Sequence, residues 1–95
     1  MERYRIVPLA RLDLDEIYVY IARDNPAAAA RWLSRAMEKF SWLAKNPACG
    51  EERNSIHPGL RCISHGRYVI YFRLRPEHLE IVRVLHGARD HTGLL

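Results

Sequence analysis

The tripeptide Asp24-Asn25-Pro26 constrains the fold of this chain more than any other short stretch. Asn25 can accept hydrogen bonds from free backbone amides as a helix N-cap, and Pro26 suits the first position of a helix, where no amide partner is lost. Apolar residues recur at helical spacing on both sides of the tripeptide. The sequence therefore predicts two helices joined by a very short connection, which is a helical hairpin.

The first helix of this hairpin is predicted over residues 9–23, because Leu14, Ile17, Tyr18 and Ile21 recur at helical spacing. Asp13, Asp15 and Glu16 are expected near its N-terminal end, where the helix dipole favours negative charge. The second helix is predicted from Pro26 to Asn46-Pro47, and its apolar stripe consists of Ala29, Leu33, Ala36, Met37, Phe40, Leu43 and Ala44.

Strands are predicted on both sides of the hairpin. Residues 3–8 contain β-forming residues in alternation, and Pro8 ends that strand. Residues 48–59 lack a periodic pattern and are expected to form a surface connection. Three further strands follow at 60–64, 67–74 and 79–85, with His65-Gly66 as a hairpin turn. The expected fold is a single α+β domain over residues 1–95, with an N-terminal strand, the helical hairpin and a mainly antiparallel meander (β-α-α-β-β-β).

The strand at 67–74 is apolar on both faces: Tyr68, Ile70, Phe72 and Leu74 share one face, and Val69 and Tyr71 share the other. Two helices cover only one face of an antiparallel sheet. We therefore expect an exposed apolar groove formed by Val69 and Tyr71 with either Val82 and Val84 or Ile81 and Leu85. Trp32 is expected on a flank of the second helix, because it lies beside the apolar stripe and not within it.

Composition limits the function classes. A chain of 95 residues buries only about 60–65% of its unfolded surface, so a partner that covers leftover apolar area would stabilise it. The net charge of +4, with thirteen arginines and two lysines spread evenly, favours acidic partners but lacks the clustered stripe of a nucleic-acid binder. We expect no direct DNA binding by this chain alone.

No cofactor, metal or membrane association is expected either. The five histidines and two cysteines show no metal-ligand spacing, and no glycine loop of the phosphate-binding type is present. The first seventeen residues alternate charged and apolar side chains, which is not the pattern of a signal peptide or a membrane span. We expect a cytoplasmic protein with both cysteines reduced.

The segment from Arg83 to Leu95 (RVLHGARDHTGLL) concentrates titratable groups after the last predicted strand. His86 and His91 are the acid–base candidates, because histidine is the side chain most often used for proton transfer, while Arg67, Arg83 and Arg89 are possible phosphate ligands. Asp90 is the carboxylate that could orient His86. The simpler interpretation is an exposed strand end at His86 and an ion pair between Arg89 and Asp90.

The order of elements, together with several short sequence matches, resembles the ParE branch of the RelE/ParE toxins of bacterial toxin–antitoxin modules. The matches cover essentially the whole chain: Ala10…Asp13-Leu14…Ile17-Tyr18…Ile21-Ala22-Arg23-Asp24-Asn25-Pro26 with Ala29 and Ala30, Leu43-Ala44…Pro47…Gly50, Arg67-Tyr68-Val69-Ile70-Tyr71, and Arg83-Val84-Leu85-His86-Gly87-Ala88-Arg89-Asp90. The resemblance implies a cytoplasmic toxin that a ParD-like antitoxin neutralises. It also implies DNA gyrase as the target for the ParE branch, whereas the RelE branch cuts messenger RNA on the ribosome.

Three functions follow as hypotheses. The first is a gyrase inhibitor that acts by binding and not as an enzyme, with target contacts at His86, Arg89, Asp90 and His91 and antitoxin contacts at Trp32, Val69, Tyr71, Val82 and Val84. The second is a RelE-type ribonuclease that uses His86, Arg67, Arg83 and Arg89. Its usual residue set is incomplete here, because the last tyrosine is Tyr71 and the only lysines are Lys39 and Lys45. The third is an inactive homologue that survives as an antitoxin-binding module.

Overall fold

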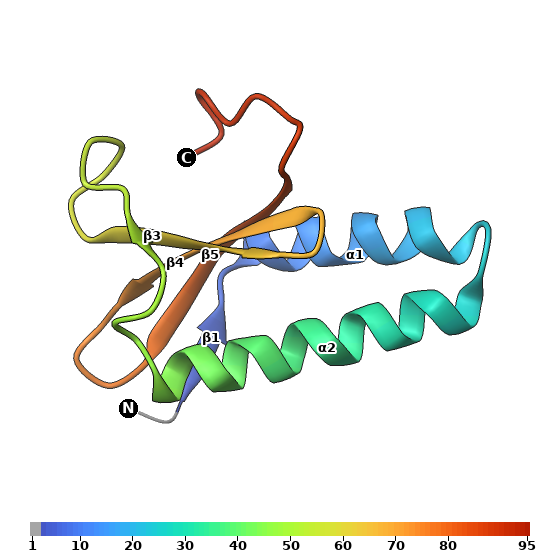
Figure 1. Cartoon of the computed structure of the whole chain (residues 1–95), viewed down its shortest axis with the longest axis horizontal. Coiled ribbons are helices and arrows are strands. Elements are labelled where there is room, and N and C mark those ends of the chain that lie inside the picture. The colour runs from blue at the N-terminus through green and yellow to red at the C-terminus, as the bar shows by residue number, and fades with distance from the viewer. Residues whose placement is uncertain (1–2) are drawn as a thin grey trace.

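The helical hairpin packs on one face of a five-stranded sheet (Figure 1). The computed structural model describes residues 3–95. Its elements are β1 (Tyr4–Ile6), α1 (Pro8–Ala22), α2 (Pro26–Lys45), β2 (Glu51–Glu52), β3 (Leu60–His65), β4 (Tyr68–Leu74) and β5 (Leu79–His86). The strand order is β1-β5-β4-β3-β2, in which β1 runs parallel to β5 and the other neighbours are antiparallel. The predicted α+β class and element order are confirmed.

Both helices begin at a proline. The Asn25 side-chain Oδ1 accepts a hydrogen bond from the Ala28 amide at 3.0 Å, and α2 starts at Pro26 as predicted. β1 ends at Ile6, two residues earlier than predicted, and Pro8 starts α1, so the helix begins one residue earlier than expected. The first turn of α1 contains no acidic residue, so the prediction that Asp13, Asp15 and Glu16 stabilise the helix dipole is wrong. Asp13 is instead buried against the sheet, with 7% of its surface exposed.

The main core lies between the hairpin and the sheet. Phe40 is completely buried there, and Tyr4 of β1 packs edge-on against its ring with 5.6 Å between centroids. The stripe predicted for α2 faces this core, with Leu33 and Met37 half-buried at its margins. The buried members from helices and strands are Ala10, Leu14, Ile17, Ala36, Phe40, Leu43, Ala44, Ile70, Phe72, Leu79, Ile81 and Val84.

Two details of the strands differ from the prediction. A short strand, β2, lies within residues 48–59 and pairs with β3, where Arg61 donates to Glu52 Oε1 and to the carbonyls of Ala48 and Gly50. The β3–β4 turn consists of Gly66 and Arg67, because His65 pairs with Tyr68. The turn is therefore one residue later than predicted, and Gly66 supplies the positive φ of 60° that it needs.

A β-bulge decides which residues of β5 face the helices. Tyr71 pairs with Arg83 and Phe72 pairs with Ile81, so Val82 is an extra residue in β5. Ile81 and Val84 consequently both join the main core, while Val82 and Leu85 both belong to the opposite face. The side chains of β5 therefore do not alternate strictly between the two faces of the sheet at this position. Both versions of the predicted groove depended on such alternation.

The face of the sheet opposite the helices is covered by the chain itself. The segment after β5 turns back over this face (Figure 1), and Leu94 and Leu95 pack against a cluster of Leu60, Cys62, Tyr71 and Leu85. Tyr71 is only 5% exposed and Leu85 only 1%. The prediction of an exposed apolar groove on this face is therefore wrong, because the tail covers it. The periodicity of the sequence did not indicate that the tail returns over the sheet.

Gly50 offers a test of how tightly β2 is held. Its φ is +94°, and an added Cβ would lie 2.8 Å from the Cys62 carbonyl oxygen and 3.0 Å from the Phe72 ring. We expect Gly50→Ala to lower the free energy of unfolding by about 1–3 kcal/mol, measured by urea denaturation. Gly59→Ala is the matched control, because Gly59 also has a positive φ but has no atom within 4 Å of an added Cβ. Equal losses in the two variants would contradict the close packing.

Candidate functional site

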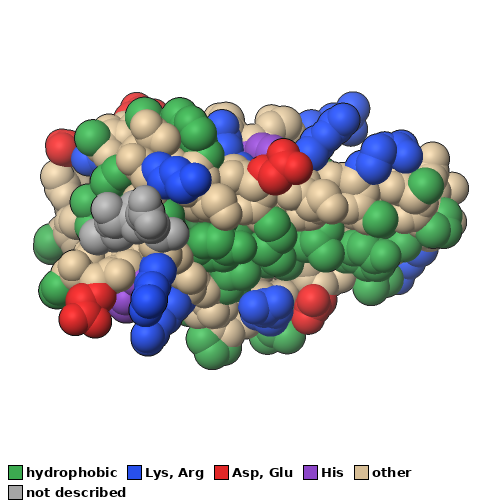
Figure 2. Space-filling view, turned by 90° about the horizontal axis from the view of Figure 1, so that it is seen from below, with side chains coloured by type: hydrophobic (Ala, Val, Ile, Leu, Met, Phe, Trp, Pro, Cys, Tyr) green, Lys and Arg blue, Asp and Glu red, His purple; other side chains and the backbone are tan. Residues whose placement is uncertain are grey.

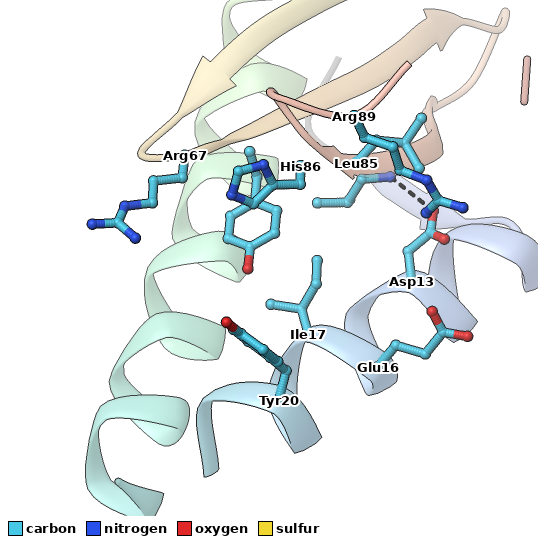
Figure 3. A pocket seen from close by; sticks show the side chains of 10 residues that line it. Asp13, Glu16, Ile17, Tyr20, Arg67, Leu85, His86 and Arg89 are labelled. Atoms are coloured by element: carbon cyan, nitrogen blue, oxygen red, sulfur yellow. Dashed lines mark hydrogen bonds between the residues drawn. The ribbon is translucent and has the colours of Figure 1, made fainter. Parts of the chain in front are cut away.

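A cleft of about 380 Å³ lies between α1 and the end of β5, beside the β3–β4 turn. We call it the target cleft. It brings together Arg67, His86 and Arg89, which come from different parts of the chain, and Figure 3 shows Arg67 on one side of His86 and Arg89 on the other. Its full lining is Asp13, Glu16, Ile17, Tyr20, Arg67, Tyr68, Val84, Leu85, His86 and Arg89. Arg83, Asp90 and His91 do not line it.

Arg83 is bound by a buried carboxylate. Its Nε and Nη2 atoms each donate to Asp13 at 2.8 Å, and its Nη1 donates to the Leu94 carbonyl at 2.8 Å. The side chains of Arg83 and Asp13 are only 13% and 8% exposed. Because all three guanidinium nitrogens are engaged, a phosphate could bind Arg83 only by displacing Asp13 or the Leu94 carbonyl, and the predicted place of Arg83 in a ribonuclease site stays a prediction.

The position of Asp13 follows from the sheet topology. β1 pairs with β5 as far as Ile81, whose carbonyl accepts from the Val7 amide, and the chain then leaves the sheet to begin α1. The Val84 amide is left at an open edge, and Asp13 Oδ2 accepts from it at 3.0 Å. The Asp13 carboxylate thus accepts from the otherwise unpaired Val84 amide and also pairs with Arg83. Arg83 in turn binds the C-terminal segment.

His86 lacks the partners of a general base. Its Nδ1 accepts a hydrogen bond from the Ala88 amide at 3.1 Å, so in the neutral ring the proton lies on Nε2. Asp90, the expected orienting carboxylate, instead accepts from the Thr92 amide at 2.9 Å, and this bond lowers the pKa of Asp90. Within residues 3–95 no carboxylate bonds to His86, whose ring packs edge-on against Tyr68 at 5.3 Å.

His91 fastens the C-terminal segment to the sheet. Its Nδ1 lies 2.6 Å from the Tyr71 hydroxyl, and its Nε2 lies 2.9 Å from the His86 carbonyl oxygen. The only tautomer that satisfies both carries the proton on Nε2 and accepts from the tyrosine hydroxyl on Nδ1. His91 is therefore a structural contact here, with both nitrogens in use.

We expect His91→Ala to weaken this attachment by about 1–3 kcal/mol, because it leaves the buried Tyr71 hydroxyl without its acceptor. Hydrogen exchange of the amides in residues 88–95 would accelerate accordingly, while exchange in α2 would stay slow. Arg89→Ala is the control, since Arg89 is exposed. Unchanged exchange in His91→Ala would show that the packing of Leu94 and Leu95 and the hydrogen bonds of their carbonyls to Arg83 and His57 hold the segment without His91.

Two tyrosines complete the target cleft and were not among the predicted site residues. Tyr20 of α1 is 68% exposed at its mouth, and Tyr68 lies at its base beside His86. Burial raises the pKa of Tyr68, so its hydroxyl stays protonated near neutral pH. The sequence signal for Tyr20 was its position three residues after Ile17, which places both on adjoining parts of one helix face.

The residues predicted to contact an antitoxin are dispersed in the structure. Trp32 is half-buried on the flank of α2, as expected, and its ring packs edge-on against Tyr68 at 5.3 Å. Val69 and Val82 are half-buried against the second apolar cluster. Val84 is 3% exposed in the main core and Tyr71 lies beneath the tail, so neither presents a docking surface in this conformation.

Two cations of the cleft have no partner within the described residues. Neither Arg67 nor Arg89 makes a side-chain hydrogen bond or ion pair with residues 3–95, so both guanidinium groups can contact an acidic partner. In the same part of the chain, no group of three or more His, Cys, Asp and Glu residues could hold a metal ion. None of the described helices is both long and apolar enough to cross a bilayer.

Comparisons with known proteins agree with one another. Residues 4–91 match the family model described as the ParE toxin of the type II toxin–antitoxin system parDE. The chain is 32% identical to Toxin ParE1 of Caulobacter vibrioides, with 98% of this chain and 100% of that protein covered. It is 31% identical to Toxin ParE1 of Mycobacterium tuberculosis, with coverage of 93% and 92%.

A solved structure described as the chromosomal ParDE TA system from P. aeruginosa contains a similar chain. Its TM-score to this structure is 0.71 at 25% sequence identity, and the match covers 90% of this chain and 96% of that one. This protein therefore shares its fold with a chain of that ParDE system. Because a family model spans nearly the whole chain and full-length relatives exceed 30% identity, the chain belongs to the ParE toxin family of type II toxin–antitoxin systems.

Proposed function

We propose that this chain is a cytoplasmic toxin that inhibits DNA gyrase by binding to it, and that a ParD-like antitoxin neutralises it. Membership of the ParE family supports the antitoxin pairing, and the resemblance to the ParE branch supports gyrase as the target. The observation that best supports inhibition by binding is the hydrogen bonding of His86. His86 lies between Arg67 and Arg89 in the target cleft with its Nδ1 lone pair already bonded to a backbone amide.

Cleavage of RNA would need more than the cleft provides. It requires a base to remove the 2′-hydroxyl proton, an acid for the leaving oxygen and cations for the phosphate. Arg67 and Arg89 supply the cations, but His91 bonds through both nitrogens outside the cleft, Arg83 is paired with Asp13, and His86 has no carboxylate partner within residues 3–95. Inhibition by binding needs no acid or base, only fixed shape and charge.

A gyrase assay run beside a translation assay tests this proposal. Purified toxin is added to gyrase with relaxed plasmid and, separately, to translating ribosomes, with the antitoxin as the neutralising control in both. We expect loss of supercoiling, intact messenger RNA and inhibition by His86→Ala within about threefold of the wild type, because truncating an exposed contact costs under about 1 kcal/mol.

Two other results would contradict the proposal. Cleavage of messenger RNA that His86→Ala abolishes would identify a ribonuclease of RelE type. A folded protein that still binds its antitoxin but has no effect in either assay would be an inactive homologue. Expected target contacts at Asp90 and His91 remain part of the proposal, although both lie on the tail outside the target cleft.

A further inference from the structure

Arg89 reaches the target cleft from a short stretch of chain outside the sheet. β5 ends at His86, and the chain turns at Gly87 and Ala88. The exposed Arg89 side chain makes no hydrogen bond or ion pair with residues 3–95. Its place in the cleft therefore depends on how the backbone of residues 86–91, which we call the 86–91 segment, is held.

The His86 carbonyl oxygen is the main acceptor within the 86–91 segment. It accepts from the Arg89 amide at 3.0 Å, and it lies 2.9 Å from His91 Nε2, which also donates to it. At the start of the segment, the Gly87 amide donates to the Arg67 carbonyl at 2.8 Å. An added Cβ at Gly87 would lie 3.3 Å from that carbonyl oxygen, so the segment packs closely on the turn that carries Arg67.

Tyr71 connects the 86–91 segment to the middle of the sheet. Its hydroxyl lies 2.6 Å from His91 Nδ1, and the two rings pack edge-on with 5.4 Å between centroids. Tyr71 is 5% exposed, and it pairs with Cys62 of β3 on one side and with Arg83 of β5 on the other. Burial raises the pKa of Tyr71, so its hydroxyl stays protonated near neutral pH and can donate to His91.

Positive charge alone does not distinguish the target cleft from other surfaces. The side of the molecule that carries α2 shows a band of hydrophobic side chains with Lys and Arg side chains on both sides of it (Figure 2). A cation on a fixed backbone loses less conformational freedom on binding than a cation on a mobile one. The distinguishing feature of Arg89 is therefore the ordered segment that carries it.

We propose that Tyr71 and His91 form a positioning pair for inhibition, which holds Arg89 in the target cleft. This inference rests on inhibition of gyrase through that cleft, as in the proposed function. His91 then contributes to inhibition through Arg89, which differs from the direct target contact expected of it. The pair uses the backbone carbonyl of His86, so His86→Ala leaves it intact, in agreement with the nearly normal inhibition expected of that variant.

Three substitutions test the positioning pair. His91→Ala removes both ring contacts, and Tyr71→Phe removes only the hydroxyl donor. Each is expected to raise the amount of toxin that halves supercoiling by about tenfold, because the segment must then become ordered when the target binds. His91→Gln should inhibit within about threefold of the wild type, since its amide offers an acceptor and a donor separated by one carbon atom, as in the ring.

A double-mutant cycle with Arg89→Ala shows whether His91 acts through Arg89. In the Arg89→Ala background, His91→Ala should change inhibition by less than about twofold, because the side chain that it positions is absent. Asn25→Ala is the matched control for a general loss of stability. It removes one hydrogen bond at the start of α2, outside the target cleft and the 86–91 segment, and should lower the melting temperature without changing inhibition.

The NMR order parameter of the Arg89 amide measures the positioning without gyrase. It should fall from about 0.85 in the wild type to below about 0.6 in His91→Ala and in Tyr71→Phe, and it should stay high in His91→Gln. Loss of order together with weaker inhibition, both restored by glutamine, supports the inference.

Three results would overturn the inference. The first is an unchanged order parameter in His91→Ala, and the second is full inhibition by that variant. The third is an equal loss of inhibition in the Arg89→Ala background, which would assign His91 to direct contact with the target. If the wild type does not inhibit gyrase at all, the proposed target is wrong, while the order parameters still decide whether the pair positions Arg89.

Discussion

Replacing Arg83 with methionine is expected to lower the free energy of unfolding by about 3–5 kcal/mol, a large part of the roughly 5–15 kcal/mol available to a small domain. The substitution leaves the Asp13 carboxylate buried with only the Val84 amide as a partner. It also removes the donor to the Leu94 carbonyl, so the tail loses one of its attachments. Urea denaturation followed by circular dichroism measures the loss.

The double variant Asp13→Asn with Arg83→Met is the control for this prediction. Asparagine keeps an acceptor for the Val84 amide but carries no charge, so the double variant should recover much of the stability that Arg83→Met loses. A loss below about 1 kcal/mol in Arg83→Met would contradict the account, since that is the size expected for an exposed ion pair.

The second large effect concerns the target cleft. The double variant of Arg67→Glu and Arg89→Glu reverses the charge of both free cations. It is expected to weaken inhibition of gyrase by about 100-fold, which corresponds to about 2.7 kcal/mol. Both side chains lie at the cleft without ion-pair partners in residues 3–95, so the melting temperature should change little. The amount of toxin that halves supercoiling is the measured quantity.

Single reversals test the target cleft residue by residue. Arg89 lines the target cleft and Arg35 does not. Arg89→Glu should therefore weaken inhibition, and Arg35→Glu should leave it unchanged. If the double variant inhibits gyrase as well as the wild type does, the target cleft is not the contact surface.

Local chemistry in the sequence predicted the fold well. Asn25 and Pro26 act within a few residues of their own position, and they correctly predicted the hairpin. The alternation at 68–72 correctly predicted two apolar faces on β4, of which Ile70 and Phe72 join one cluster and Tyr71 the other. β2 was missed because two glutamates carry no strand pattern, and its pairing depends on Arg61 in another strand.

The candidate site was harder to predict because it depends on contacts between distant residues. Asp13 and Arg83 lie seventy positions apart, so nothing in the sequence around either showed that they pair. The bulge at Val82 and the return of Leu94 over the sheet likewise result from tertiary packing. His86 and Arg89 were predicted because titratable residues follow the last strand, and both line the target cleft, whereas Tyr20 and Tyr68 were interpreted as ordinary apolar positions.

Direct binding is the sharpest test of the proposed function, because inhibition by binding requires a stable complex with gyrase and no chemical turnover. Isothermal titration of purified gyrase with the toxin should show saturable binding at a fixed stoichiometry. The His86→Ala variant should still bind, and the double variant of Arg67→Glu and Arg89→Glu should not. Prior addition of the antitoxin should prevent binding of the wild type. Absence of any binding between gyrase and a folded toxin that its antitoxin still recognises would contradict the account.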